Sequence, residues 1–227
     1  MKAFLLDRGL SLATVLLVLF VVSLSQASIS YTIGFGALSS LLPKDTSPIV
    51  TALVALRFGV IALLVVLWAF KRKRALFRAI VVVNTLFTLA LLGHTNALLG
   101  VLFGSVSNAI NTLLLDVVLM AASNILIFSI WYWIIDPPGV EERRRDDEPW
   151  EFLFPQRGGS LPHYESWVPR YADYLFVAFT TSFAFSPTDA LPLTRRAKML
   201  MLLQAAISVV TLTGVAGSAI NILAGRG

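Results

Sequence analysis

Two charged side chains, Arg57 and Asp116, stand inside long apolar runs of the sequence and are the first candidates for chemistry. Each lies roughly nine residues into its run, a depth of about 14 Å if both runs are helices that point in the same direction. A charge at mid-membrane is costly, so each side chain must face a partner or a wet cavity. The matched depth favours an intramembrane ion pair that clasps two helices. The alternatives are a gate, a carboxylate-binding site at Arg57 or a proton-handling carboxylate at Asp116.

A second set of candidate side chains carries oxygen atoms near the end of the chain. Its hydroxyls could line an ion path and bind a monovalent ion, and a carboxylate at the mouth would set a preference for cations. The residues that would form this path are Thr180, Thr181, Ser186, Thr188 and Asp189.

The apolar segment that carries these hydroxyls is short. Residues 173–186 form a mostly apolar segment of fewer than about 15 residues, whereas roughly 20 are needed to cross a hydrocarbon core of about 30 Å. A polar turn at 187–189 separates this segment from the long apolar run 198–223. The order of short helix, turn and full span indicates a re-entrant loop, which requires surrounding protein or a water-filled cavity at membrane depth. A full crossing by residues 171–191 is the alternative.

The composition is typical of an integral membrane protein. Of the 227 residues 57% are hydrophobic and only 14% are charged, and the mean hydropathy is +0.79. The charges gather in a few clusters, with long apolar runs between them. We therefore predict an all-α polytopic transmembrane helical bundle with five long spans plus one short C-terminal membrane or re-entrant helix. The predicted long spans are residues 10–33, 48–70, 75–99, 107–135 and 198–223.

Three regions follow from this pattern. Residues 1–136 form a four-helix transmembrane region, 137–170 a cytoplasmic or interfacial linker, and 171–227 a pore-like pair of one short and one long membrane helix. Lysine and arginine clusters at 71–74 and 143–145 favour a cytoplasmic N-terminus for a multi-pass protein of the cell membrane. The start of the first span resembles a secretory signal peptide, but apolar residues continue beyond it, so we expect this span to be retained.

Several function classes find no support in the residues. The net charge of +5 reflects orientation in the membrane rather than nucleic-acid binding, because no basic stripe with interleaved aromatic residues occurs. The sequence has no cysteine, and it lacks hydrolase, nucleotide-binding and metalloprotease motifs. We therefore expect no enzyme activity, no metal site and no cofactor.

Other polar and small residues within the spans are interpreted as packing contacts. Asn84, Asn124 and Gln204 are typical of side chains that hydrogen-bond across helix interfaces. His94 is interpreted as an interfacial residue near the outer end of its helix. Gly214 and the small residues after it give the last span a face suited to close helix contact, including self-association.

The residues from Asp173 to Thr194 resemble the pore domain of two-span potassium channels. The aromatic-rich run at 173–181 is similar to a pore helix, Asp189 falls at the place of the filter aspartate, and a proline precedes the last helix. Residues 184–188, with the sequence Ala-Phe-Ser-Pro-Thr, stand where that family has its TVGYG filter, so both filter glycines are absent. Those glycines let successive carbonyls point at the ion, so the resemblance does not imply potassium selectivity.

The same region is similar to that of an uncharacterised bacterial family of polytopic membrane proteins, a domain of unknown function. That family combines an aromatic D-[FY]-L-[FY] segment, a polar S-x-T-D or S-D turn and an R-R doublet. The matching positions are residues 173–176, 186–189 and 195–196. This resemblance implies an integral membrane protein and no particular activity.

The C-terminal pattern predicts an ion-channel-like pore with a non-potassium-type filter. A pore with one re-entrant loop per chain requires several chains around an axis, so a homo-oligomer is expected. The other expected partners are the lipid bilayer and a monovalent ion. The alternatives are a structural or accessory membrane subunit without transport activity and a small secondary transporter.

Overall fold

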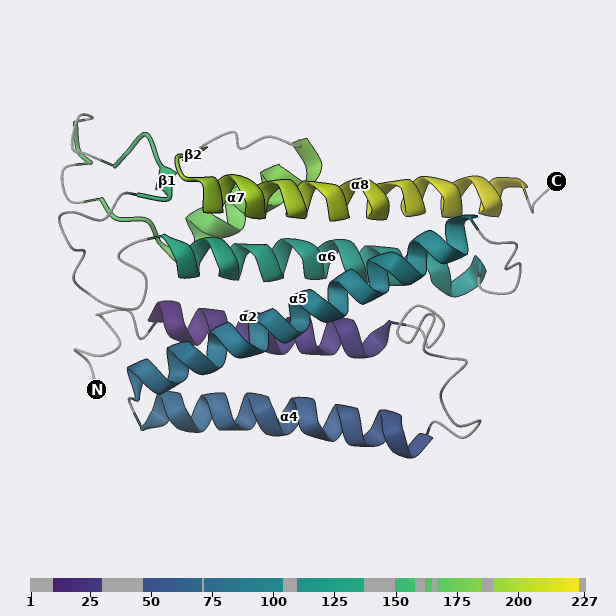
Figure 1. Ribbon diagram of the computed structural model, residues 1–227, viewed down its shortest axis with the longest axis horizontal. Coiled ribbons are helices and arrows are strands. Elements are labelled where there is room, and N and C mark those ends of the chain that lie inside the picture. Colours follow the sequence, from purple (N-terminus) through teal and green to yellow (C-terminus); the bar gives the residue numbers. More distant parts are fainter. Residues whose placement is uncertain are drawn as a thin grey trace.

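The computed structural model of the protein describes residues 10–29, 47–70, 72–103, 110–136, 150–157, 162–164, 167–184 and 190–224. Within these residues the chain forms helices and one two-stranded sheet (Figure 1). The helices are α2 (Leu10–Ser28), α4 (Ser47–Ala69), α5 (Lys73–Phe103), α6 (Ile110–Ile135), α7 (Tyr171–Ala184) and α8 (Arg195–Ala224). The predicted all-α class is confirmed.

Three of these helices are long and apolar enough to cross a membrane. Their candidate spans are Arg74–Gly100 in α5, Leu113–Ile135 in α6 and Arg195–Gly217 in α8. Among the described residues, shorter apolar stretches lie in α2, at Leu12–Ser28, and in α4, at Ala55–Ala69. The multi-pass membrane class is therefore supported by three candidate spans. Five long spans and a cytoplasmic N-terminus stay predictions.

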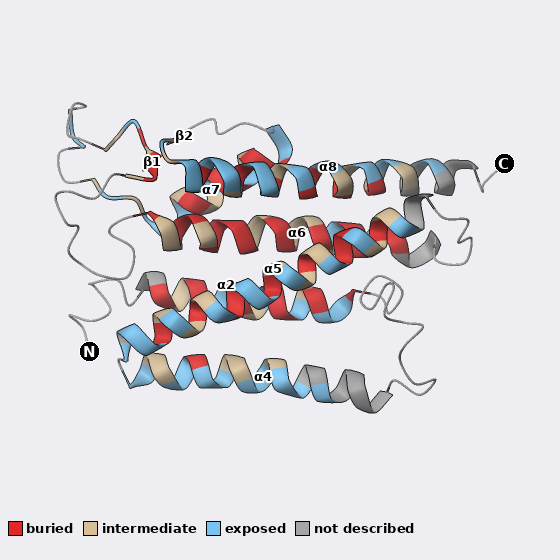
Figure 2. Cartoon of the chain, in the orientation of Figure 1, coloured by how far each residue is buried: buried red, intermediate tan, exposed pale blue. Residues whose placement is uncertain are grey.

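Helix α6 is the centre of the bundle. It packs against α2, α5, α7 and α8, while α5 runs diagonally across α2 and α6 (Figure 1). Residues 123–135 of α6 are all buried or half-buried, as expected for a helix that neighbours enclose on every side (Figure 2). The helix ends just before Pro137 of the sequence, because a proline cannot continue the hydrogen-bond ladder.

The outward faces of the peripheral helices are apolar. Large hydrophobic side chains are exposed on α4, α5 and α8, and Figure 2 shows the outer faces of these helices mostly in pale blue. Leu63 of α4, Leu86 of α5 and Leu202 of α8 are examples. Soluble proteins rarely expose so much contiguous apolar surface, whereas a lipid bilayer covers it.

Helix α7 is short and lies against α6 and α8. Its 14 residues bury Tyr171, Tyr174, Val177, Ala178, Thr181 and Ser182. At 1.5 Å per residue α7 is about 21 Å long, which is less than a hydrocarbon core requires. Both α7 and α8 begin at the end of the bundle where α6 ends (Figure 1). The two helices therefore start from one end of the bundle, and α7 stops partway along α8 (Figure 1).

A short antiparallel ladder closes that end of the bundle. Strand β1 (Phe152–Leu153) pairs with strand β2 (Leu191–Pro192), with Phe152 opposite Pro192. Phe152 is buried, and its ring lies edge-on to Tyr132 of α6 at a centroid distance of 5.1 Å. The predicted linker 137–170 therefore contains a packed segment at 150–157, which covers the ends of α6, α7 and α8.

Three helices approach one another closely at Gly214 of α8. A Cβ atom at this position would lie 3.1 Å from Cδ2 of Leu98 on α5 and 3.2 Å from Cγ2 of Val117 on α6. Only glycine leaves both neighbours undisturbed here, because any other residue adds a methyl group or more at that point. The close helix contact expected at Gly214 is thus confirmed within a single chain.

Candidate functional site

Three ionisable side chains, from α4, α5 and α6, are linked through the central one, His94, which interacts with each of the other two. Asp116 is 2% exposed, His94 is 5% exposed and Arg57 is half-buried. The imidazole of His94 interacts electrostatically with both the Arg57 guanidinium and the Asp116 carboxylate. We refer to Arg57, His94 and Asp116 as the charged cluster. Among the described residues, these are the ionisable side chains of the apolar spans that the structure brings together.

His94 is the member of the charged cluster that was not predicted as a functional residue. The sequence suggests a peripheral place for His94, whereas its side chain is buried in the bundle. The reason is its position on the inward face of α5, where buried residues recur at helical spacing. This buried stripe comprises Phe87, Leu91, His94 and Leu98. The spacing could have identified His94, and a direct ion pair between Arg57 and Asp116 stays a prediction.

One nitrogen of the His94 imidazole is unsatisfied. Nδ1 is buried and has no hydrogen-bond partner among the described residues. A buried polar atom without a partner costs about 1–3 kcal/mol, so such atoms are few in folded proteins and call for an explanation. An imidazole nitrogen can donate or accept a hydrogen bond, so Nδ1 can pair with a group of either kind.

The predicted C-terminal ion path is described only in part. The hydroxyl of Thr180 donates to the carbonyl oxygens of Phe176, at 3.0 Å, and Val177, at 3.1 Å. The hydroxyl of Thr181 is buried and donates to Val177 at 2.7 Å. Both hydroxyls thus donate within α7 itself. The remaining predicted ligands, Ser186, Thr188 and Asp189, lie outside the described residues, and the ion path stays a prediction.

The middle of α7 is fixed by a polar network around Gln204 of α8. The amide nitrogen of Gln204 donates to the carbonyl of Ala178 at 2.8 Å and to Oγ of Ser182 at 2.7 Å. Its amide oxygen accepts a hydrogen bond from the hydroxyl of Tyr132 on α6. Asn124 of α6 joins the network by donating to the carbonyl of Gln204 at 3.2 Å. The predicted packing role of Gln204 and Asn124 is confirmed by these contacts between α6, α7 and α8.

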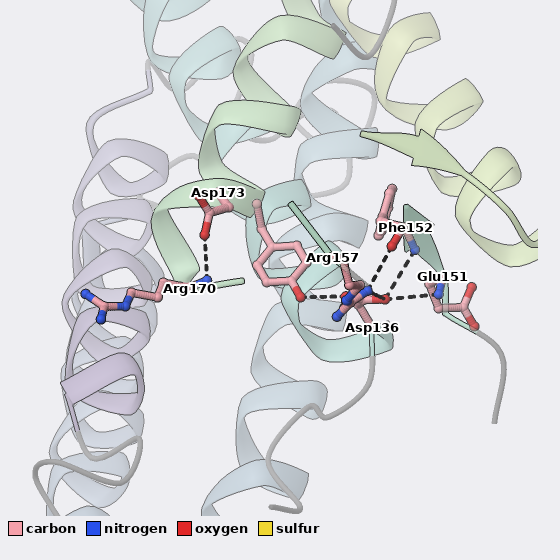
Figure 3. A network of polar contacts seen from close by, with 7 residues as sticks. Asp136, Glu151, Phe152, Arg157, Arg170 and Asp173 are labelled. Atoms are coloured by element: carbon pink, nitrogen blue, oxygen red, sulfur yellow. Dashed lines mark hydrogen bonds and ion pairs between the residues drawn. The ribbon is translucent and has the colours of Figure 1, made fainter. Parts of the chain in front are cut away.

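The start of α7 is fixed by a second network around Asp136, which follows α6 (Figure 3). Asp136 is 1% exposed, and its Oδ1 accepts hydrogen bonds from the backbone N–H groups of Glu151, at 3.0 Å, and Phe152, at 3.2 Å. Oδ2 lies 2.8 Å from the Arg157 guanidinium and accepts a 2.6 Å hydrogen bond from the hydroxyl of Tyr174. Four polar groups thus compensate one buried carboxylate. Sequence reasoning missed this site because its members are distant in the chain.

A neighbouring carboxylate, Glu151, ties the same segment to the start of α8. Its carboxylate accepts a hydrogen bond from the hydroxyl of Thr194 and lies 2.9 Å from the Arg196 guanidinium. Thr194 also caps α8, because its Oγ1 accepts a hydrogen bond from the N–H of Ala197 at 3.2 Å. The segment at 150–157 therefore connects α6, α7 and α8 at one end of the bundle.

Neither network nor the charged cluster has the make-up of a metal centre. Among the described residues, no group of three or more histidine and acidic side chains is placed to hold a metal ion.

Comparisons of the chain with protein-family models, with curated proteins and with solved structures give no match. The resemblances to the bacterial membrane family and to channel pore domains therefore stay predictions. What the described residues show is an all-α bundle with three candidate membrane spans and a charged cluster of which His94 and Asp116 are buried.

Proposed function

We propose that the protein is a membrane transport protein that moves a small monovalent cation through its helical bundle, with the charged cluster as the binding site. The observation that carries this proposal is the burial of Asp116 and His94, together with the electrostatic interaction of His94 with Asp116 and Arg57. Ionisable side chains inside membrane spans are costly, and where they occur they mark ion pathways, proton relays or counter-ions.

Each member of the charged cluster has its own role in this proposal. The carboxylate of Asp116 compensates the charge of a cation that has left its hydration shell. Arg57 compensates Asp116 when no cation is bound, so that the buried carboxylate is never an isolated charge. His94 offers a nitrogen that accepts or gives a proton, which links the occupancy of the site to the proton gradient.

A second candidate is the ion-channel-like pore with a non-potassium-type filter, formed by residues 171–227 of several copies of the chain. The course of the chain favours it, because α7 and α8 begin at the same end of the bundle, as in a re-entrant helix pair. It ranks second because the outward face of α7 presents phenyl rings rather than hydroxyls. The rings on that face belong to Phe176, Phe179 and Phe183.

The experiment that tests both candidates is ion flux in liposomes that contain the purified protein. Gradients of potassium, sodium, protons and chloride are compared for the wild type and for the variants Asp116→Asn and Asp189→Asn. Asp147→Asn serves as the matched control, because it makes the same change in the charged run of the linker. Folding of each variant is checked by circular dichroism and by gel filtration before flux is measured.

The three outcomes separate the candidates. Cation flux that is lost in Asp116→Asn and retained in Asp189→Asn supports transport through the charged cluster. Flux that depends on Asp189 alone assigns the path to the C-terminal pore. No flux of any tested ion, from protein that is folded, contradicts both transport proposals and leaves a structural or accessory subunit.

A further inference from the structure

Three buried amide side chains, one each on α2, α5 and α6, make the same kind of hydrogen bond to a neighbouring helix. All of them are 3% exposed or less, and each donates from its amide nitrogen to a backbone carbonyl of a neighbouring helix. The pairs are Gln26 with Phe87 at 2.9 Å, Asn84 with Ile127 at 3.2 Å and Asn124 with Gln204 at 3.2 Å. A carbonyl oxygen accepts hydrogen bonds and never donates them. The amide nitrogen must therefore face the carbonyl, and the amide oxygen must face the other way.

The three amide oxygens that result have no donor among the described residues. Oε1 of Gln26 and Oδ1 of Asn84 and Asn124 are buried and unpartnered. The same holds for Oγ of Ser123, beside Asn124 on α6, and for Nδ1 of His94. The side chain of Gln204 differs from these three, because both its amide oxygen and its amide nitrogen form hydrogen bonds. Helices α2, α5 and α6, which carry the five unpartnered atoms, pack against one another.

These atoms need donors that lipid does not supply. A buried oxygen without a donor is unfavourable, and hydrocarbon offers no hydrogen-bonding group. The usual partner of such an atom is an internal water molecule, which makes about three hydrogen bonds to otherwise unsatisfied polar groups. Water fits the five atoms because it donates to the amide oxygens and either donates to or accepts from an imidazole nitrogen or a hydroxyl.

We propose that bound water molecules satisfy the amide oxygens of Gln26, Asn84 and Asn124, and that these waters form a row inside the bundle that leads to the charged cluster. Asp116 and Asn124 lie on one face of α6, eight residues apart, which is about 12 Å along the helix axis. Met120 lies between them and is fully buried. We refer to this set of waters as the water row.

The water row indicates which monovalent cation is transported, which the proposed function does not specify. A proton passes from one hydrogen-bonded oxygen to the next while another leaves at the far end, so no further reactant is consumed. A larger cation would have to displace the waters. The assignment of the proton as the transported ion rests on the proposed function, whereas the binding of water does not.

The experiment that tests the water row is X-ray radiolytic labelling of the folded wild-type protein in detergent or nanodiscs. A short pulse converts bound water into hydroxyl radicals, which oxidise the nearest side chain before radicals from bulk water reach the core. Met120 is the reporter, because it is buried beside the proposed row and forms a sulfoxide that mass spectrometry detects. Tyr164, an exposed residue, gives the labelling rate in bulk water.

The expected result is labelling of Met120 at a rate comparable to that of Tyr164, with most of this label lost in Asn124→Leu and in Asn84→Leu. The control Asn96→Leu changes the same residue type at an exposed position of α5 and should leave the label unchanged. Unlabelled Met120 in the folded wild type overturns the water row, and this result does not depend on whether the variants fold. Label that is the same in wild type and in a folded Asn124→Leu variant overturns it as well.

Flux measurements separate this inference from the proposed function. Labelled Met120 in a protein without any flux supports the water row and contradicts transport. Flux that depends on Asp116 in a protein with unlabelled Met120 contradicts the water row and leaves transport in place. Sodium or potassium flux without proton flux overturns the assignment of the proton.

Discussion

The hydroxyl of Tyr174 donates a 2.6 Å hydrogen bond to Oδ2 of Asp136, and this contact joins the start of α7 to the end of α6. Both side chains are buried. Burial, together with the neighbouring Asp136 carboxylate, raises the pKa of the Tyr174 phenol well above its ordinary value, so the phenol stays protonated and keeps donating. Because Gln204 holds the same helix further along, α7 is fixed at two places by its own chain.

Removal of the Tyr174 hydroxyl should destabilise the protein. Tyr174→Phe leaves a buried carboxylate oxygen with one donor fewer, so we expect the free energy of unfolding to fall by about 1–3 kcal/mol. Denaturant unfolding in micelles, followed by circular dichroism, measures the change. Tyr164→Phe removes the same group from an exposed position and should have little effect. Equal losses in the two variants would show that the contact with Asp136 carries no stability.

Alkaline pH should destabilise the protein through the same phenol. The folded-state pKa of Tyr174 lies above the ordinary value of 10.0, so the stability that this residue contributes is complete below pH 10.0. It is lost as the pH rises from that value through the folded-state pKa, because only the unfolded chain ionises readily there. Unfolding midpoints measured across this range should fall less steeply in Tyr174→Phe than in the wild type. Parallel curves would contradict the assignment.

Loss of the Gln204 side chain should loosen α7. Gln204→Leu removes the donor to Ala178 and Ser182 and the acceptor of the Tyr132 hydroxyl, with an expected loss of about 1–3 kcal/mol. Since the chain has no cysteine, a Val177→Cys reporter on the buried face of α7 reacts with a maleimide only when this helix detaches. We expect faster labelling in Gln204→Leu.

The matched control for this experiment is Thr213→Val, an exposed position of α8 whose hydroxyl bonds only to its own helix at Val209. Labelling of the reporter should be the same in this control as in the unsubstituted background. An unchanged labelling rate in Gln204→Leu would mean that apolar packing alone holds α7 in place.

A methyl group at Gly214 should destabilise the bundle. In Gly214→Ala the new Cβ would lie 3.1 Å from Leu98, and such overpacking costs about 1–3 kcal/mol, against roughly 1 kcal/mol gained from helix propensity. Gly100→Ala makes the same change on α5, where a Cβ meets nothing within 4 Å, so thermal unfolding should show a gain in stability. Stabilisation by both substitutions would contradict the close packing of α5, α6 and α8.

The sequence predicts the helices of this fold well because each long helix is a long apolar run. The predicted short segment 173–186 corresponds to α7 (Tyr171–Ala184), and the predicted end of the span 107–135 corresponds to the end of α6, just before the proline at position 137. These features depend on local composition, length and proline chemistry, all of which a single sequence contains.

The packed segment at 150–157 could not be predicted in the same way. Its position depends on Asp136, which gathers backbone N–H groups from residues fifteen and sixteen positions later in the chain. A charged residue beside two prolines and a mixed charge run is ordinarily a solvated one, so local pattern points away from burial. Only the three-dimensional arrangement of α6, α7 and β1 shows that the Asp136 carboxylate is enclosed.

Of the three members of the charged cluster, the sequence singles out two and leaves His94 aside. Arg57 and Asp116 are conspicuous because a charge interrupts an apolar run, whereas His94 lies near the end of its helix among small and polar residues. Its burial follows from the spacing of Leu91, His94 and Leu98 on α5, which a helical projection of the sequence would have revealed.

The most direct test of transport through the charged cluster is proton and cation flux into liposomes that contain either the wild type or Asp116→Asn, at equal protein density and under the same membrane potential. Transport through the charged cluster requires flux in the wild type, its loss in folded Asp116→Asn and a reduced flux in His94→Gln. Undiminished flux in Asp116→Asn, or no flux in the folded wild type, would contradict transport through the charged cluster.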